Sequence, residues 1–242
     1  MNAFAVVLCK VIAYLLAGLY GVGIPVRVRG GALAGKITVT AHSGCMSLAD
    51  NSVEAMAAGA AAGADIVEFD LNCAADGTLV LSHDAPDETG AYVTLEEAFA
   101  FLAAHPGVRA NVDVKSTRYL EKAPALAARA GVTDRIFFTG VEEKDVPAVR
   151  EKCPGIPYYL NADVSEDTDF RALAQKTADL GAVGINIYWK NASPALVRAF
   201  HQKGMPVSVW TVNEAKDALL SALLGVDNIT TRRPDAVCGL IR

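Results

Sequence analysis

The feature that most constrains the fold of this chain is a regular alternation of short apolar runs with longer amphipathic stretches from Ile37 onward. The short runs have the length of strands, and the longer stretches have helical periodicity. Ser193 followed by Pro194 is typical of a helix start, and Thr94 with Glu97 fits a capping box. About eight strand–helix repeats predict an α/β fold, a (β/α)8 TIM barrel, whereas a doubly wound open sheet is the alternative with the same alternation.

The predicted strands are Ile37–Ala41, Ile66–Leu71, Thr78–Ser82, Ala110–Val114, Ile136–Thr139, Pro157–Leu160, Val183–Tyr188, Pro206–Val212 and Asn228–Thr230. The predicted helices are Ser52–Ala62, Leu95–Ala104, Tyr119–Ala130, Lys144–Lys152, Asp169–Leu180, Pro194–Lys203 and Glu214–Leu224. These nine predicted strands are one more than the eight of a (β/α)8 barrel. The Asp76-Gly77 turn predicts that the second and third runs form a hairpin or a split strand.

The first 30 residues differ in kind from the rest. Residues 3–26 carry one charge, Lys10, and this stretch is longer than the roughly 20 residues that a helix needs to cross a bilayer. We therefore expect an apolar N-terminal helix within residues 1–30, followed by a barrel domain over residues 37–242. Such a helix predicts that the protein is associated with a membrane through a single anchor. The side of the membrane on which the barrel domain lies stays open. The alternative is a helix that covers the barrel.

Composition excludes several classes of protein. The formal charge of −5 at pH 7 disfavours a nucleic-acid partner, and 52% hydrophobic residues suffice for a large core. The five cysteines are widely spaced and form no Cys-x-x-Cys pair, which excludes a zinc ribbon and a disulfide framework. A bridge between Cys45 and Cys73 stays open.

Charged side chains gather where the predicted strands end. Glu68 and Asp70 alternate within one strand and therefore face the same side, as do Asp113 and Lys115 in another. His42 follows the first strand and His83 the third. Active residues of a barrel lie at the carboxyl ends of its strands, so we expect these side chains to form one site.

The chemistry of that site follows from the residue types. Glu68, Asp70 and Asp113 offer hard oxygen ligands, which suit Mg²⁺ or Ca²⁺. His42 and His83 can exchange protons near neutral pH as an acid–base pair. Together with the positive charge of Lys115, this set suits cleavage of a phosphodiester.

Motifs over nearly the whole chain after Val39 resemble the glycerophosphodiester phosphodiesterase family. They are His42-Ser-Gly44, Asp50-Asn51-Ser52, Glu68-Phe-Asp70, Asp76-Gly77, His83-Asp84, Asp113-Val-Lys115, Trp210-Thr-Val-Asn213 and Arg233-Pro234-Asp235. The resemblance implies a TIM-barrel enzyme that hydrolyses a glycerophosphodiester to a glycerol phosphate and an alcohol, through a cyclic phosphate. It implies metal ligands at Glu68, Asp70 and Asp113, catalytic His42 and His83, and a phosphate contact at Lys115. Trp210 and Asn213, which lie at the end of another predicted strand, are further candidate substrate contacts.

The chain departs from the family pattern at several positions. Ser43 stands where the family has an arginine after its first histidine, and Asp113 stands where it has a glutamate. A serine hydroxyl cannot replace the planar fork that a guanidinium offers to two phosphate oxygens. The insertion after the second histidine is almost absent, because His83 lies close in sequence to Thr94. We therefore expect an open barrel mouth.

Two classes of function remain open at this point. The first is an enzyme, a metal-dependent hydrolase of soluble glycerophosphodiesters or of lysophospholipids, or a lyase that stops at the cyclic phosphate. The second is a non-catalytic phosphate-binding or scaffolding barrel, for which Ser43 is the best support.

Overall fold

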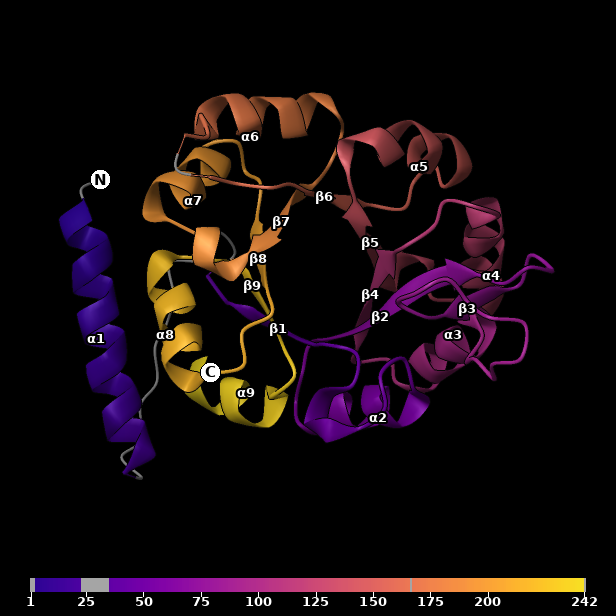
Figure 1. The fold of residues 1–242 in the computed structure, drawn as a ribbon, viewed down its shortest axis with the longest axis horizontal. Coiled ribbons are helices and arrows are strands. Elements are labelled where there is room, and N and C mark those ends of the chain that lie inside the picture. Colours follow the sequence, from indigo (N-terminus) through magenta and orange to yellow (C-terminus); the bar gives the residue numbers. More distant parts are fainter. Residues whose placement is uncertain (1–2, 23–34, 166, 242) are drawn as a thin grey trace.

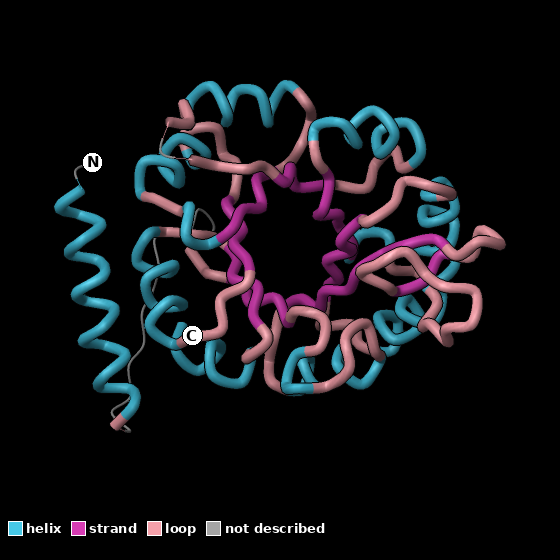
Figure 2. Tube along the Cα trace, viewed as in Figure 1, coloured by secondary structure: helices cyan, strands magenta, loops and turns pink. Residues whose placement is uncertain are grey.

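The computed structural model describes residues 3–22, 35–165 and 167–241. Within them, eight parallel strands close into a barrel that helices surround (Figures 1 and 2). The barrel strands are β1 (Thr38–Ala41), β2 (Ile66–Cys73), β4 (Arg109–Val114), β5 (Ile136–Val141), β6 (Tyr158–Asn161), β7 (Gly184–Tyr188), β8 (Val207–Trp210) and β9 (Asn228–Thr231). The ring closes because β1 pairs with β9 on one side and with β2 on the other. This confirms the predicted barrel and excludes the open sheet.

The additional strand is the hairpin arm that the sequence predicts. β3 (Leu79–Leu81) runs antiparallel to β2 and lies outside the ring. The turn between them includes Gly77 at a φ of 83°, a conformation that glycine adopts without steric cost. The hairpin places the end of β3, Leu81, beside Leu71 of β2, so that His83 follows close to Asp70 and reaches the barrel mouth.

The helices lie outside the strands (Figure 1). They are α1 (Ala3–Gly21), α2 (Val53–Ala61), α3 (Leu95–Ala104), α4 (Ala123–Ala130), α5 (Val146–Lys152), α6 (Phe170–Asp179), α7 (Pro194–His201), α8 (Ala215–Leu224) and α9 (Pro234–Ile241). The capping box of Thr94 and Glu97 is confirmed, and the Ser193 side chain caps α7. α9 is absent from the sequence-based prediction, although Pro234 at its first position is a typical start signal.

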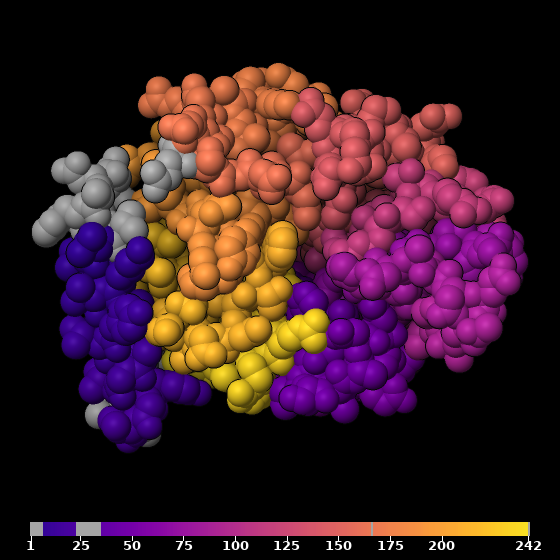
Figure 3. All heavy atoms as spheres, in the orientation of Figure 1, coloured from indigo at the N-terminus to yellow at the C-terminus, as the bar shows by residue number. Residues whose placement is uncertain are grey.

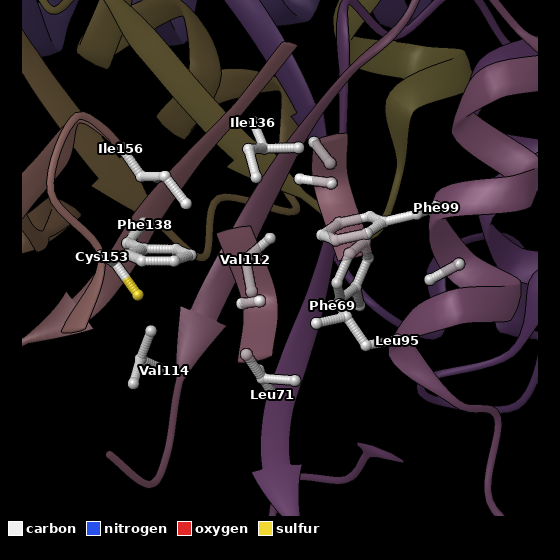
Figure 4. Close-up of a cluster of buried hydrophobic side chains, with 14 of the residues drawn as sticks. Phe69, Leu71, Leu95, Phe99, Val112, Val114, Ile136, Phe138, Cys153 and Ile156 are labelled. Carbon is white, nitrogen blue, oxygen red and sulfur yellow. The ribbon is translucent and has the colours of Figure 1, made fainter. Parts of the chain in front are cut away.

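Successive side chains of a barrel strand point alternately outward, into the hydrophobic core beneath the helices, and inward, to the centre of the barrel. Phe69 and Leu71 of β2 point outward and pack with Leu95 and Phe99 of α3 (Figure 4). The residues between them therefore point into the barrel. Because helices cover the outer side and polar side chains fill the inner side, all of β2 is buried. This is the reason why Glu68, Asp70 and Asn72 are buried although they alternate with the apolar residues of β2.

α1 lies outside the barrel, along α8 (Figures 1 and 3). One face packs on the C-terminal half of the barrel through Cys9, Ala13, Leu16, Ala17 and Tyr20. This is the arrangement that the barrel-covering alternative expects. Among the described residues, no helix is long and apolar enough to cross a membrane. The predicted association with a membrane therefore gains no support here.

The structure describes all of the cysteines, and it forms no disulfide between any two of them, Cys45 and Cys73 included. The bridge between these two residues, which the sequence leaves open, is not formed. Both side chains are buried, as are those of Cys153 and Cys238. These thiols therefore pack as small apolar groups of the fold.

Candidate active site

A cavity of about 700 Å³ opens at the carboxyl ends of the barrel strands. It brings together most of the side chains that the sequence singles out: His42, Glu68, Asp70, His83, Asp113, Lys115 and Trp210. Asn213 is the exception. It lies outside the lining of the cavity, and its Oδ1 accepts a hydrogen bond from the backbone N–H of Arg232 at 2.9 Å.

The three carboxylates form a tight group. Asp70 of β2 lies beside Asp113 of β4 in the parallel register, and Glu68 precedes Asp70 on the same side of its strand. One oxygen from each carboxylate lies within 4.8 Å of the others. Glu68 and Asp70 are only 5% and 4% exposed. Such a cluster of buried oxygens is a suitable donor set for a hard divalent cation.

A backbone N–H and the side chain of an asparagine, both from the segment between β1 and α2, orient the buried carboxylates. The N–H of Ser43 donates to Glu68 Oε2 at 2.8 Å. Asn51 donates from Nδ2 to Asp70 Oδ2 at 2.9 Å and accepts from the backbone N–H of Asp70 at 2.8 Å. Sequence analysis gives Asn51 only as part of the Asp50-Asn51-Ser52 motif before α2, which Ser52 caps. The position of Asn51 beside β2 depends on the tertiary structure.

The charge of the cluster is balanced only in part. Burial raises the pKa of Glu68 well above its usual range, and the charges of Asp70 and Asp113 raise it further. Lys115 lies 2.6 Å from Asp113 and 3.1 Å from Asp70. Burial alone would lower the pKa of Lys115, but these two carboxylates raise it overall. Three carboxylates against one ammonium leave room for a cation of higher charge.

His42 lies beside this cluster, 3.7 Å from Glu68 Oε2. Its Nδ1 lies 2.8 Å from the carbonyl oxygen of Ser43, which can only accept, so Nδ1 carries the proton and Nε2 carries the lone pair. Burial lowers the pKa of His42, and the positive charge of Arg232 lowers it further. The neutral form, which can accept a proton at Nε2, is therefore favoured.

His83 reaches the cavity from the hairpin. Its side chain is 69% exposed, and its Nδ1 lies 2.9 Å from the Asp84 carboxylate. An anionic acceptor fixes the proton on Nδ1 and leaves Nε2 for exchange with a substrate. The two histidines are thus held in different surroundings, one half-buried and one near the solvent.

The side chains that β6, β7 and β8 themselves present to the opposite wall of the cavity are neutral, and Asp163 lies on the rim beyond β6. The neutral side chains are those of Asn161, Asn186, Tyr188 and Trp210. Nδ2 of Asn186 donates to Asn161 Oδ1 at 3.2 Å, but Oδ1 of Asn186 is buried without a hydrogen-bond partner among the described residues. An unpaired buried carbonyl is costly, which marks Oδ1 as a position for a donor from a ligand.

These two asparagines are site residues that sequence analysis does not find, whereas a place near the barrel mouth is expected for Arg232 or Arg233, just after the last predicted strand. Asn161 and Asn186 each lie at or near the end of an apolar run, where an asparagine is also a common turn residue. The one sequence signal for a shared role of these asparagines is that they lie at similar positions in consecutive predicted strands. Arg232 follows the last strand, and its role depends on closure of the ring.

Comparison with known proteins agrees with this geometry. The family model "Glycerophosphoryl diester phosphodiesterase family" matches residues 41–100 and 87–236. A glycerophosphodiester phosphodiesterase of Caldanaerobacter subterraneus subsp. tengcongensis is 23% identical, over 86% of this chain and 98% of that protein.

Solved structures show the same fold. A glycerophosphodiester phosphodiesterase from Agrobacterium tumefaciens str. C58 superposes with a TM-score of 0.71 at 18% identity, over 84% of this chain and 100% of that one. An Oleispira antarctica phosphodiesterase in complex with its product sn-glycerol-3-phosphate has a TM-score of 0.68 at 17% identity, over 85% of this chain and 96% of that one. By its family match, this chain belongs to the glycerophosphoryl diester phosphodiesterase family, a family of phosphoric diester hydrolases.

Proposed function

We propose that this protein hydrolyses glycerophosphodiesters to a glycerol phosphate and an alcohol, with a divalent cation as cofactor and His42 and His83 as catalytic residues. The observation that carries the proposal is the group of three carboxylates within 4.8 Å, beside a half-buried histidine and inside a cavity of about 700 Å³. Titratable groups with shifted pKa values in a cleft are typical of catalysis.

Glu68, Asp70 and Asp113 are the residues that would hold the cation. Their oxygens and the surplus of negative charge fit Mg²⁺ or Ca²⁺ better than a metal that prefers thiolates. When bound, such an ion polarises a phosphoryl oxygen and lowers the pKa of a nearby hydroxyl. Lys115 adds a fixed positive charge on the same side of the cavity.

The histidines move the protons of the reaction. His42 Nε2 takes the proton of a glycerol hydroxyl, whose oxygen attacks the phosphorus. The bond from the phosphorus to the alcohol oxygen breaks, and the imidazolium form of His83, whose Nδ1 contacts Asp84, donates its Nε2 proton to that oxygen and becomes neutral. The product is a cyclic phosphate and a free alcohol. Water then opens the ring, with the two histidines exchanging roles. A lyase would stop before this step.

The neutral wall supports a substrate that carries hydroxyl groups. A glycerol hydroxyl would donate to the unpartnered Asn186 Oδ1, which lies opposite the carboxylates. The short segment between His83 and α3 leaves the mouth open, so that both small diesters and lysophospholipids are candidate substrates. The membrane association predicted from residues 3–26 remains a separate prediction, and the hydrolase proposal does not depend on it.

Turnover of glycerophosphocholine and of a lysophospholipid by the full chain tests the proposal. We expect turnover with added Mg²⁺ or Ca²⁺ and none with chelator. Product analysis by ³¹P NMR separates a glycerol phosphate from a cyclic phosphate, the product of a lyase. Glu68→Gln should remove turnover, whereas Glu142→Gln, which changes a carboxylate on the rim of the same cavity, should retain it. A folded protein that binds the ion and cleaves neither substrate would favour the non-catalytic barrel.

A further inference from the structure

One positively charged side chain that lines the cavity has no role in the proposed reaction so far. Among the described residues that line it, the cationic side chains other than histidine are Lys115, Lys144 and Arg232. Lys115 is occupied by Asp70 and Asp113, and Lys144 lies on the rim, 74% exposed and paired with Glu142. Arg232 is the one guanidinium, and it lies on the side of His42.

The closure of the barrel places Arg232 beside His42. Ala41 of β1 and Thr231 of β9 are partners in the parallel register, so the next residues, His42 and Arg232, leave neighbouring strand ends. The backbone of Arg232 is held on both sides. Its N–H donates to Asn213 Oδ1 at 2.9 Å, and its carbonyl accepts from the N–H of Met46 at 3.0 Å. The residue therefore has a fixed position at the mouth.

The side chain of Arg232 crosses the loop that carries Ser43. Its Nη1 lies 2.8 Å from Asp50 Oδ1. Gly44 lies beneath this ion pair at a φ of 69°, and a Cβ there would overlap the Asp50 carboxylate and lie 2.8 Å from Arg232 Nη1. The loop thus lacks a side chain at the point where the guanidinium approaches it. The Cβ of any other residue at position 44 would fill this space.

Arg232 also retains free binding capacity. A guanidinium has five N–H donors in a planar fork, and Asp50 engages one nitrogen. The side chain is 41% exposed and lines the cavity, so a ligand in the cavity can reach it. Its charge acts on His42, whose pKa it lowers. An anion beside His42 would therefore lie within the field of Arg232.

We propose that Arg232 binds the phosphate group of the substrate and supplies, from the loop after β9, the guanidinium that Ser43 lacks in the loop after β1. The inference rests on the proposed function, since it concerns the phosphate of that reaction. Asn213 and Asp50 are positioning residues: the first holds the backbone of Arg232 and the second holds its side chain. A fork that contacts two phosphate oxygens also fixes the orientation of the phosphorus.

Arg232→Gln tests the proposal, with Arg233→Gln as the matched control. Arg233 is the next residue, but it pairs with Asp235 and does not line the cavity. Two quantities are measured: kcat/KM for glycerophosphocholine, and the Kd of sn-glycerol 3-phosphate by calorimetry in the presence of Mg²⁺. We expect Arg232→Gln to weaken both by about 10- to 100-fold, as the loss of a charged hydrogen bond does. Arg233→Gln should change each by less than about 2-fold.

Two further variants guard against a trivial loss of folding. Arg232→Lys keeps the charge but not the fork, so its Kd should lie between those of the wild type and Arg232→Gln. Ser43→Arg in the Arg232→Gln background should restore part of the lost kcat/KM. An Arg232→Gln protein with wild-type melting temperature, kcat/KM and Kd would overturn the inference and leave the proposed function standing. Absence of turnover in the wild type would instead count against the proposed function, and the Kd values would then decide the role of Arg232.

Discussion

The two walls of the barrel mouth differ sharply in charge. The wall formed by β1, β2 and β4 carries His42, Glu68, Asp70, Asp113 and Lys115, and the wall formed by β6, β7 and β8 carries Asn161, Asn186, Tyr188 and Trp210. On the first wall the polar groups contact one another, with Lys115 bridging Asp70 and Asp113. On the second, one buried oxygen of Asn186 has no partner among the described residues.

The difference indicates a division of labour. Charges that hold one another in place are suited to a cation and to proton transfer, where a fixed field matters most. A neutral wall with solvent-exposed aromatic rings and a hydrogen-bond acceptor without a partner among the described residues is suited to substrate recognition. Its groups are available to contact the substrate. Changes on the charged wall should therefore affect turnover, and changes on the neutral wall should affect substrate binding.

The largest effect is expected from His42→Ala on the charged wall. Loss of the proton acceptor should lower kcat by about 10²- to 10⁴-fold with little change in KM. His105→Ala is the matched control, because that histidine lies at the end of α3, stacked on Phe101 and away from the cavity. Steady-state kinetics on glycerophosphocholine make the measurement. Equal losses in the two variants would contradict the assignment of His42.

The next effect is that of the cation on stability. Three carboxylates within 4.8 Å should bind Mg²⁺ in the folded state only, which adds about 2.7 kcal/mol to the free energy of unfolding at 100 times the Kd. Thermal melting with Mg²⁺ and with chelator measures the gain. Asp70→Asn should remove most of it, and Asp163→Asn, which changes a rim residue, should not. A gain that survives Asp70→Asn would place the ion elsewhere.

The gain should also depend on pH. Because the pKa of Glu68 is raised in the folded protein, a proton stabilises the fold fully below the ordinary value of 4.5, and this stabilisation is lost as the pH rises through the raised pKa. The cation competes with that proton for the same carboxylate. The stabilisation by Mg²⁺ should therefore grow with rising pH across this range and shrink as the pH falls. If Mg²⁺ raised the melting temperature by the same amount at every pH, this would contradict a role for Glu68 as a ligand.

The two walls also differ in how far the sequence predicts them. Charged residues such as Glu68 and Asp70 are conspicuous within buried apolar strands, so their common location follows from alternation and from the barrel rule. An asparagine near a strand end, such as Asn186, is an ordinary turn signal and carries no such information. Arg232 lies 182 residues from Asp50 in sequence, and only the pairing of β9 with β1 brings them together.

The same reasoning explains the accuracy of the fold prediction. The strands are short, buried and bounded by clear breaks, so the nine predicted runs lie close to the limits of the nine strands among the described residues. α9 was missed because its eight residues, Pro234–Ile241, contain too few polar positions to reveal a helical period. Capping residues were predicted well, since Thr94 and Glu97 act within one turn of helix.

On the neutral wall, Asn186→Leu should separate binding from stability. If Asn186 Oδ1 accepts from a substrate hydroxyl, KM for glycerophosphocholine should rise by up to about 10-fold, the value of one neutral hydrogen bond. The melting temperature should change little, because removal of a buried unpaired carbonyl offsets the loss of the Nδ2 hydrogen bond to Asn161, whose Oδ1 still accepts from the N–H of Gly140. A marked loss of stability with unchanged KM would show that the amide serves the fold instead.

The smallest effect is expected at Trp210, which is 39% exposed at the mouth with Tyr188 as its neighbour, 6.0 Å away between ring centroids. An exposed ring that contacts a quaternary ammonium contributes about 0.5–1 kcal/mol, so Trp210→Ala should raise KM for glycerophosphocholine by about 2- to 5-fold. A diester with an uncharged alcohol of similar size should show no such change, and that pair of substrates is the comparison to measure. Trp189→Ala is the control, because Trp189 packs against the core beside α7 and does not line the cavity. Equal losses for the charged and the uncharged alcohol would mean that Trp210 shapes the mouth by packing, and the neutral wall would then recognise the glycerol end of the substrate alone.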